Sequence, residues 1–283
     1  MNGQRTVLVT GGTGFIGSNL VHNLVQRGWN VHLIVRPDSK FDLIHGIKQK
    51  LTCHVFEGST TELSEILRRV QPSIVFHLAS YFRAQHVPND IEPMLSSNLL
   101  FAVQLLDAMA KEGVRLMVNT GTVWQHYEGK EYSPVCLYAA TKQAFEALLQ
   151  FYVEANDINV ITLKLADTYG PNDPRPKLLS QIRKAAGEGA ALEMSPGEQH
   201  VDFVHVDDVV EAYFSAALRL FHGDVNGHER YSVTSGRPIK LRDFVNEFIQ
   251  NEKLVVNINW GARAYRKREV FLLSTPHPSV IPK

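Results

Sequence analysis

A glycine-rich turn near the start of the chain constrains the fold more than any other feature. The run TGGTGFIG puts Gly11, Gly14 and Gly17 in a GxxGxxG pattern, after the apolar residues 7–9 and before a helix expected over 14–27. A strand, a tight glycine turn and a helix let the backbone approach a pyrophosphate closely. The helix N-terminus then offers free amides and the positive end of its dipole to that anion. The segment therefore predicts the start of a Rossmann domain that binds a dinucleotide.

Strands and helices alternate through the first half of the chain. Short apolar runs predict strands at 7–9, 31–35, 51–56, 73–78, 115–119 and 159–165, and amphipathic stretches predict helices at 14–27, 63–70, 94–113 and 138–156. This alternation is typical of an α/β fold with a doubly wound parallel sheet. We expect this Rossmann-type domain to comprise residues 1–166 together with about 201–225.

The pattern changes after residue 166. The run TYGPNDPRP is dense in proline and turn residues. Helices are expected at 178–187, 207–220 and 241–251, with a short strand at 255–258, and the helix at 207–220 is expected to pack back on the main sheet. The remaining segments, 167–200 and 226–283, predict a smaller C-terminal lobe that binds the substrate.

Composition excludes several classes of function. Among 283 residues, Lys plus Arg and Asp plus Glu both number 29, which argues against a nucleic-acid partner. The basic run RAYRKR at 263–268 is read as a solvated face or a small anion contact. Cys53 and Cys136 suggest no disulfide framework, which favours the cytoplasm. No apolar run is long enough to cross a membrane, and the histidines form no metal-binding pattern.

The end of the second strand bears on the choice of cofactor. NAD enzymes carry an acidic residue there for the ribose hydroxyls, but this chain has Val35 followed by Arg36. A cation suits the extra phosphate of NADP, and Lys40 can assist. The sequence therefore favours NADP(H) over NAD(H), with a solvated strand end as the other reading of Arg36.

A tyrosine and a lysine form the pattern YxxxK at the start of a predicted helix. The spacing puts Tyr138 and Lys142 on one helix face. A lysine ammonium there is expected to lower the tyrosine pKa, so that the phenol can exchange a proton with a carbonyl or hydroxyl oxygen. The run NTGTVW supplies Thr120 and Thr122 at the carboxyl edge of the fifth strand, where ligands of such sheets bind.

These motifs together resemble the extended short-chain dehydrogenase/reductases, which include sugar-nucleotide epimerases, dehydratases and reductases. TGGTGFIG, FHLAS, SSNLLFAVQLLDA, NTGTVW, YAATK, TYGP and HVDFVHVDDV occur in the family's order, from Val7 to about Tyr265. The resemblance implies that Tyr138 is the general acid/base. It implies that Lys142 binds the nicotinamide ribose and that Thr120, with Thr122 as second choice, bonds the reacting oxygen. Asn98 matches a structural asparagine behind the site.

The resemblance also implies two sets of binding residues. The cofactor set is Gly11, Thr13, Gly14, Phe15, Ile16, Gly17, Arg36, Ser59, Thr60, Leu78, Ala79, Ser80, Tyr138, Lys142 and Leu165. The substrate candidates are Arg83, Thr122, Asp167, Thr168, Arg175, Lys177, His200 and Arg263, each of which also fits an ordinary surface role. A diphosphate needs cations, which favours Lys177 and Arg263.

Departures from the family pattern narrow the reaction. Gly121 and Thr122 stand where dehydratases carry an acidic pair, Val201 stands where epimerases carry an arginine, Asp167 replaces an asparagine, and Ser59 replaces an aspartate near the adenine. The stretches LKLADTYGPNDPRPKL and GEQHVDFVHVDD look most like the reductases of 4-keto-6-deoxy sugar nucleotides, such as CDP-abequose and CDP-paratose synthases of O-antigen biosynthesis. The expectation is NADPH-dependent reduction of the 4-keto group. An NAD-dependent 4-epimerase and a non-catalytic NADP-sensing protein remain alternatives.

The family also pairs two long helices per subunit in a homodimer. The corresponding helices are expected at 94–110 and 138–152, where Phe101, Leu105, Phe145 and Leu149 supply apolar positions. Core packing against the chain's own sheet explains the same stripe. We expect a homodimer. The apolar stripe itself is explained equally by a dimer interface and by packing in the core.

Overall fold

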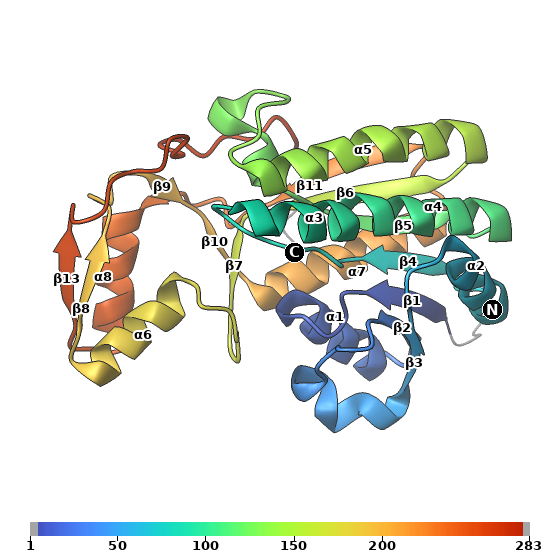
Figure 1. Cartoon of the computed structure of the whole chain (residues 1–283), viewed down its shortest axis with the longest axis horizontal. Helices are drawn as coiled ribbons and strands as arrows, with labels where there is room; N and C mark the ends of the chain where they lie inside the picture. The colour runs from blue at the N-terminus through green and yellow to red at the C-terminus, as the bar shows by residue number, and fades with distance from the viewer. Residues whose placement is uncertain (1–4, 280–283) are drawn as a thin grey trace.

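A single parallel sheet organises most of the molecule. The computed structural model describes residues 5–279, and seven strands lie in the order β11-β6-β5-β4-β1-β2-β3 (Figure 1). The strands are β1 Thr6–Thr10, β2 Asn30–Val35, β3 Leu51–Val55, β4 Ile74–His77, β5 Leu116–Thr122, β6 Asn159–Leu165 and β11 His228–Val233. Every neighbouring pair is parallel. The predicted doubly wound, Rossmann-type α/β fold is confirmed.

The direction of strand addition reverses at β1. From β1 the chain adds β2 and β3 on one side, and it then returns to add β4, β5, β6 and β11 on the other. In open α/β sheets, ligands bind in the crevice outside the carboxyl ends of the strands at such a reversal. The loops that follow β1 and β4 meet there, so the topology itself places a binding crevice beside the glycine turn.

Helices cover both faces of the sheet. Helices α2, α4 and α5 enclose one apolar core, and α1 and α7 enclose the other. The helical elements of this domain are α1 Phe15–Gln26, the 3-10 segment η1 Asp42–Lys50, α2 Thr60–Val70, α3 Ile91–Leu95, the π-helical turn η3 Ser96–Leu100, α4 Phe101–Glu112, α5 Leu137–Asn156 and α7 Val206–His222. Burial on both faces explains why strands such as β1, with Val7, Leu8 and Val9 fully buried, read as continuous apolar runs.

A smaller lobe projects from the carboxyl edge of the sheet (left in Figure 1). Helices α6 Leu178–Glu188 and α8 Leu241–Asn251 share a small core with the parallel pair β8 Ala191–Met194 and β13 Asn257–Trp260. The lobe is joined to the main sheet through two further pairs of short strands. These are β7 Asp167–Tyr169 with β10 Phe203–His205, and β9 His200–Val201 with β12 Ile239–Lys240.

The expected boundary at residue 226 is wrong for one strand. The sequence predicts that 226–283 belongs to the small lobe, but β11 pairs with β6 in the main sheet. The sequence of β11, HERYSV, is too polar to predict a strand. Polar residues are tolerated there because β11 lies at the sheet edge, where His228 and Arg230 have polar surroundings. The strand expected at 255–258 overlaps β13, but the sequence does not predict the other short strands of the lobe, since tertiary pairing rather than local sequence holds them. The ends of the expected domains, residues 1–4 and 280–283, lie outside the described residues.

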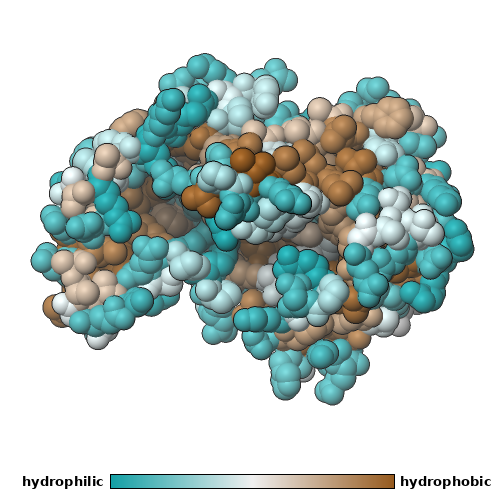
Figure 2. Space-filling view, viewed as in Figure 1, coloured by the Kyte–Doolittle hydropathy of each residue, from teal (hydrophilic) through white to brown (hydrophobic). Residues whose placement is uncertain are grey.

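The apolar stripe expected at a dimer interface belongs to the core. Leu105, Phe145 and Leu149 are fully or almost fully buried within one chain. Other apolar side chains on these helices face solvent, and Figure 2 shows brown side chains over this part of the surface. They are Leu95, Leu100, Leu148 and Phe151, each at least 41% exposed. Within residues 5–279, no helix combines the length and the apolar character needed to cross a membrane.

Candidate active site

The glycine turn between β1 and α1 forms an anion cradle. A Cβ on Gly11, whose φ is +72°, would lie 2.6 Å from the backbone nitrogen of Ala79, and a Cβ on Gly17 would lie 2.1 Å from the Gly11 carbonyl oxygen. Only glycine therefore fits at these two positions. The Gly14 amide donates to the Gly11 carbonyl at 3.1 Å and the Ser18 amide donates to the Gly14 carbonyl at 2.8 Å, so the amides of residues 15–17 point out of the helix end. This cradle fits the pyrophosphate of a dinucleotide.

The end of β4 is bonded to the end of β1 beside the cradle. The Leu78 amide donates to the Thr10 carbonyl at 3.1 Å, and the Ala79 amide donates to the Thr10 hydroxyl at 3.2 Å. That hydroxyl also lies 2.9 Å from Nδ1 of His77. Burial, aided by Lys142, lowers the pKa of His77 to about 3, so this imidazole is neutral. The predicted cofactor residues 78–80 therefore lie at the crevice where the direction of strand addition reverses.

Arg36 and Ser59 follow the carboxyl ends of β2 and β3. The Arg36 side chain is 72% exposed and lies 3.4 Å from the Asp38 carboxylate. The Ser59 hydroxyl accepts the Glu62 amide at 3.2 Å and caps α2, in which Thr60 is the first residue. Arg36 is therefore accessible to a ligand, whereas the Ser59 hydroxyl already has a structural partner.

Tyr138 and Lys142 lie on the first turns of α5, as the sequence predicts. Lys142 is 3% exposed, and its Nζ lies 6.0 Å from the centre of the Tyr138 ring. The Phe82 ring meets the Tyr138 ring edge to face at 4.8 Å. A partly buried tyrosine and a buried lysine therefore lie side by side on one face of α5 at the carboxyl edge of the sheet.

Burial controls the protonation of this pair. It raises the pKa of Tyr138 to about 12, against the opposing effects of Ser80 and Arg175, and it lowers the pKa of Lys142 to about 8. Glu146, one turn further along α5, opposes the fall in the Lys142 pKa. The expectation that Lys142 lowers the Tyr138 pKa is wrong for this structure, because burial disfavours the charged form of each group. Tyr138 is thus a protonated donor at neutral pH.

Asn98 fastens the loop after β4 to α5. Its side chain lies in the π-helical turn between α3 and α4, where it accepts the Tyr81 amide at 2.7 Å and the Ser80 hydroxyl at 3.1 Å. Its amide donates to the Thr141 hydroxyl at 3.0 Å, and Thr141 donates to the Tyr138 carbonyl at 2.7 Å. These hydrogen bonds agree with the structural role implied for Asn98, because they fix the loop at residues 80–81 relative to Tyr138.

The two threonines at the end of β5 differ in their contacts. The Thr120 hydroxyl donates to the His77 carbonyl at 2.7 Å and lies 2.6 Å from the hydroxyl of Tyr213 on α7. The Thr122 hydroxyl accepts the Trp124 amide at 3.2 Å and caps a short 3-10 turn. Thr122 is thus bound in a local turn, which leaves Thr120 as the candidate for the reacting oxygen.

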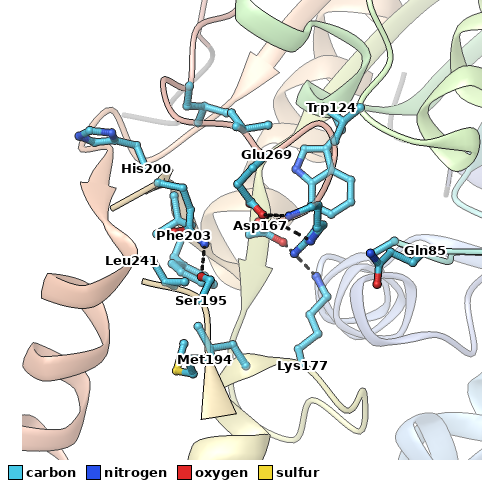
Figure 3. A pocket seen from close by; sticks show the side chains of 18 of the residues that line it. Gln85, Trp124, Asp167, Lys177, Met194, Ser195, His200, Phe203, Leu241 and Glu269 are labelled. Carbon is cyan, nitrogen blue, oxygen red and sulfur yellow. Dashed lines mark hydrogen bonds and ion pairs between the residues drawn. The ribbon is translucent and has the colours of Figure 1, made fainter. Parts of the chain in front are cut away.

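A cavity of about 480 Å³ separates the sheet edge from the small lobe. Four of the predicted substrate residues line it, namely Asp167, Lys177, His200 and Arg263. Residues that the sequence did not single out also line it, among them Phe82, Gln85, Trp124, Arg266, Arg268 and Glu269. In Figure 3, Lys177 reaches toward Asp167, and the two groups are 3.4 Å apart. The lining therefore holds four cations, Lys177, Arg263, Arg266 and Arg268, and four carboxylates, Asp167, Glu193, Asp202 and Glu269.

Four substrate candidates lie outside the lining of this cavity. Thr122 caps its own turn, as described above. Arg83 binds the Asp90 carboxylate at 3.2 Å, and the Thr168 hydroxyl donates to the Ala166 carbonyl at 3.3 Å. Arg175 binds Asp173 at 2.6 Å and lies over the Phe15 ring at 4.4 Å, beside the glycine cradle. The two arginines are held by nearby carboxylates, and each threonine hydroxyl is bonded to a backbone group two residues away.

The missed cations come from the basic run at 263–268. The Arg266 guanidinium lies 5.5 Å from the centre of the Trp124 ring, and Arg268 donates to the Ser133 hydroxyl at 2.7 Å. The sequence marks this run as a solvated face or a small anion contact, but it does not say where in the fold the two arginines lie. Only the fold brings this late segment across to the turn after β5.

The fold, the glycine cradle and the Tyr138–Lys142 pair define a dinucleotide-dependent enzyme class, the extended short-chain dehydrogenase/reductases. The family described as "NAD dependent epimerase/dehydratase family" matches residues 7–232, and the chain belongs to this family.

Named relatives span more than one reaction. A CDP-abequose synthase from Salmonella muenchen is 28% identical over 94% of this chain and 87% of its own length. A UDP-glucose 4-epimerase from Mycolicibacterium smegmatis is 29% identical over 83% of this chain and 79% of its own. The solved structure of a Brucella ovis UDP-glucose 4-epimerase in complex with NAD aligns with a TM-score of 0.84, at 20% identity, over 96% of this chain and 90% of that one.

Proposed function

We propose that the protein reduces the 4-keto group of a nucleotide-diphosphate 4-keto-6-deoxy sugar with NADPH. The observation that carries this proposal is the cavity with four cations in its lining, whose residue Phe82 meets the Tyr138 ring at the sheet edge. Tyr138, Lys142 and Thr120 lie behind this lining at the same edge. The CDP-abequose synthase relative supports the same class of substrate.

The cofactor is held by the cradle and by the end of β2. The outward amides at the start of α1 bind the pyrophosphate, and Arg36 binds the additional phosphate of NADP. Val35 at the end of β2 leaves that position without the carboxylate that favours NAD. Lys142 is the donor for the nicotinamide ribose, and Leu78, Ala79, Ser80 and Leu165 line the crevice.

Tyr138 supplies the proton and Thr120 holds the reacting oxygen. Bound NADPH supplies the hydride that reaches carbon 4 of the sugar. The carbonyl oxygen takes the phenolic proton of Tyr138, so that ketone, hydride and proton together give the alcohol. The raised pKa of Tyr138, about 12, keeps that proton available at neutral pH.

The opposite wall of the cavity binds the diphosphate. Lys177, Arg263 and Arg266 approach from the small lobe and the segment that follows it. Each charge-assisted hydrogen bond to a phosphate contributes about 1.5–3 kcal/mol when both groups are well placed. The carboxylates of Asp167 and Glu269 hold two of these cations in place beforehand, at 3.4 Å from Lys177 and 3.9 Å from Arg266.

The turn after Thr120 favours reduction over dehydration. A Cβ on Gly121 would lie 2.9 Å from the Gln125 amide oxygen and 3.1 Å from side-chain carbons of Lys164 and Thr162. An acidic side chain, as in the dehydratases, would require these neighbouring side chains to shift. The 4-epimerase remains the second candidate because of its 29% identical relative.

Substrate turnover tests the proposal. Purified protein is mixed with NADPH and, in turn, the CDP-, UDP- and dTDP-linked 4-keto-6-deoxy sugars, while NADPH absorbance and the NMR spectrum of the product are recorded. We expect a stoichiometric loss of NADPH, with formation of a nucleotide-linked 6-deoxy sugar that carries a hydroxyl group at carbon 4. Interconversion of UDP-glucose and UDP-galactose without net loss of cofactor would instead establish the epimerase. No turnover of any keto sugar would refute the reductase.

We propose further that the chain forms a homodimer through α3, α4 and α5. The exposed Leu95, Leu100, Leu148 and Phe151 on these helices support this assembly. Light scattering on the wild-type protein and on a Leu148→Glu, Phe151→Glu variant tests it. A dimer that the two substitutions convert to a monomer is expected, and a monomeric wild-type protein would refute the proposal.

A further inference from the structure

A second tyrosine lies behind the candidate reaction site. Tyr213 is on α7, on the face of the sheet opposite α5, and its side chain is fully buried. Its ring meets Phe76 edge to face at 6.5 Å, and its hydroxyl lies 2.6 Å from the hydroxyl of Thr120. A buried phenol that lacked a partner would cost free energy, so this contact is needed for stability whatever else it does.

Counting hydrogens fixes the direction of this bond. A threonine hydroxyl has one hydrogen and two lone pairs. Thr120 gives its hydrogen to the His77 carbonyl at 2.7 Å, so the hydrogen between Thr120 and Tyr213 belongs to Tyr213. Burial raises the pKa of Tyr213 well above its usual value, which keeps it a donor at every working pH. The bonds therefore run in one direction, from Tyr213 to Thr120 to the His77 carbonyl.

We propose that Tyr213 is a positioning residue that orients and polarises the Thr120 hydroxyl for the reacting oxygen. This inference rests on the proposed function, in which Thr120 turns its hydrogen from the His77 carbonyl to the substrate oxygen. Throughout that turn, Tyr213 holds the Thr120 oxygen in place by donating to one of its lone pairs. A hydroxyl that accepts a hydrogen bond is also the stronger donor, so the phenol improves the bond that Thr120 makes.

Two features separate this role from ordinary core packing. Tyr213 is fully buried and, like Thr120, is not among the described residues that line the cavity, so removal of its hydroxyl leaves that lining unchanged. Its hydroxyl contacts Thr120 and none of the cations that line the opposite wall. A structural phenol would affect stability alone, whereas a positioning phenol affects turnover through Thr120.

The test is a double-mutant cycle of Tyr213→Phe and Thr120→Val. Tyr213→Phe is expected to lower kcat about tenfold, the loss of one hydrogen bond, with KM changed less than about twofold. Thr120→Val is expected to lower kcat about a hundredfold, and the double variant is expected to match Thr120→Val alone, because the phenol acts only through that hydroxyl. An unchanged kcat in Tyr213→Phe, or effects that multiply, would overturn the proposal.

Tyr231→Phe is the matched control. Its hydroxyl donates to Glu229 at 2.7 Å on the edge strand β11, away from Thr120. This variant should keep the wild-type kcat. Circular dichroism melting of all variants reports whether a loss of turnover merely follows a loss of folding.

A second measurement does not depend on turnover. In protein labelled at threonine methyl groups, three-bond couplings report the χ1 rotamer of Thr120. One rotamer is expected in the wild type, and averaging among rotamers is expected in Tyr213→Phe. If the wild type reduces no keto sugar, the proposed function fails and this coupling decides the role of Tyr213. An unchanged single rotamer in Tyr213→Phe would refute that role.

Discussion

The two sides of the candidate site, the sheet wall and the lobe wall, are built by different means. On the sheet wall, Thr120 and Lys142 lie behind the residues that line the cavity and are at least 92% buried, and Thr120 donates to the His77 carbonyl at 2.7 Å. On the side of the small lobe, the Lys177 and Arg266 side chains are 31% and 42% exposed and are held by single ion pairs. A fixed, dry wall suits proton transfer, which requires one geometry. A wetter wall of exchangeable ion pairs suits recognition of an anion.

This comparison predicts that changes to the sheet wall act on kcat and changes to the lobe wall act on KM. The largest effect is expected for Tyr138→Phe, which removes the acidic hydrogen and keeps the ring. Steady-state assays should show a loss of kcat of about 10³-fold, with NADPH binding kept by fluorescence titration. Tyr152→Phe, near the far end of α5, is the control and should keep its activity. Retention of more than about a tenth of the rate in Tyr138→Phe would contradict this role.

Arg266→Ala should give the opposite signature. Loss of one charge-assisted bond to the diphosphate raises KM about 30-fold, with kcat changed less than about threefold. Lys184→Ala, an exposed cation on α6 that pairs with Glu188 at 3.8 Å, is the control and should leave KM unchanged. A fall in kcat larger than the rise in KM would break the division between the two walls.

The pH dependence sharpens the comparison. Reduction needs the Tyr138 hydrogen, whose pKa of about 12 keeps it bound, and the Lys142 ammonium, whose pKa is about 8. Because a lysine loses its charge as pH rises, kcat should be level below pH about 8 and fall about tenfold per unit above it. Glu146→Gln should move this break to lower pH, since the carboxylate raises the pKa of Lys142. Arg266→Ala should leave the pH of this break unchanged. A flat profile through pH 10 would contradict the role of Lys142.

The smallest effect concerns the cofactor. Arg36 is exposed and lies beside Asp38, so water and this carboxylate weaken its contribution. Arg36→Ala should weaken NADPH binding about tenfold and NADH binding less than about twofold. Lys50→Ala, an exposed cation at the end of η1, is the control. Equal losses for the two cofactors would remove the argument for NADP.

The sheet wall could be predicted from sequence because consecutive residues encode it. TGGTGFIG contains its own turn and helix start, and the spacing of Tyr138 and Lys142 fixes their common face. The lobe wall joins distant segments, so Trp124 and Arg266 could not be paired without the fold. Tyr213 sits in an apolar helix and reads as core from sequence alone. The polar strand β11 was missed for the related reason that its polar side chains are satisfied only by tertiary partners.

The most direct test of this division is ligand binding without turnover. CDP, UDP and dTDP are titrated in a calorimeter into wild-type, Tyr138→Phe and Arg266→Ala protein. These diphosphates carry no sugar to reduce, so the measured Kd reports binding at the lobe wall alone. For the base that binds best, Tyr138→Phe should match the wild-type Kd within about twofold, and Arg266→Ala should be weaker by about tenfold or more. Equal weakening in both variants, or an unchanged Kd in Arg266→Ala, would contradict the account.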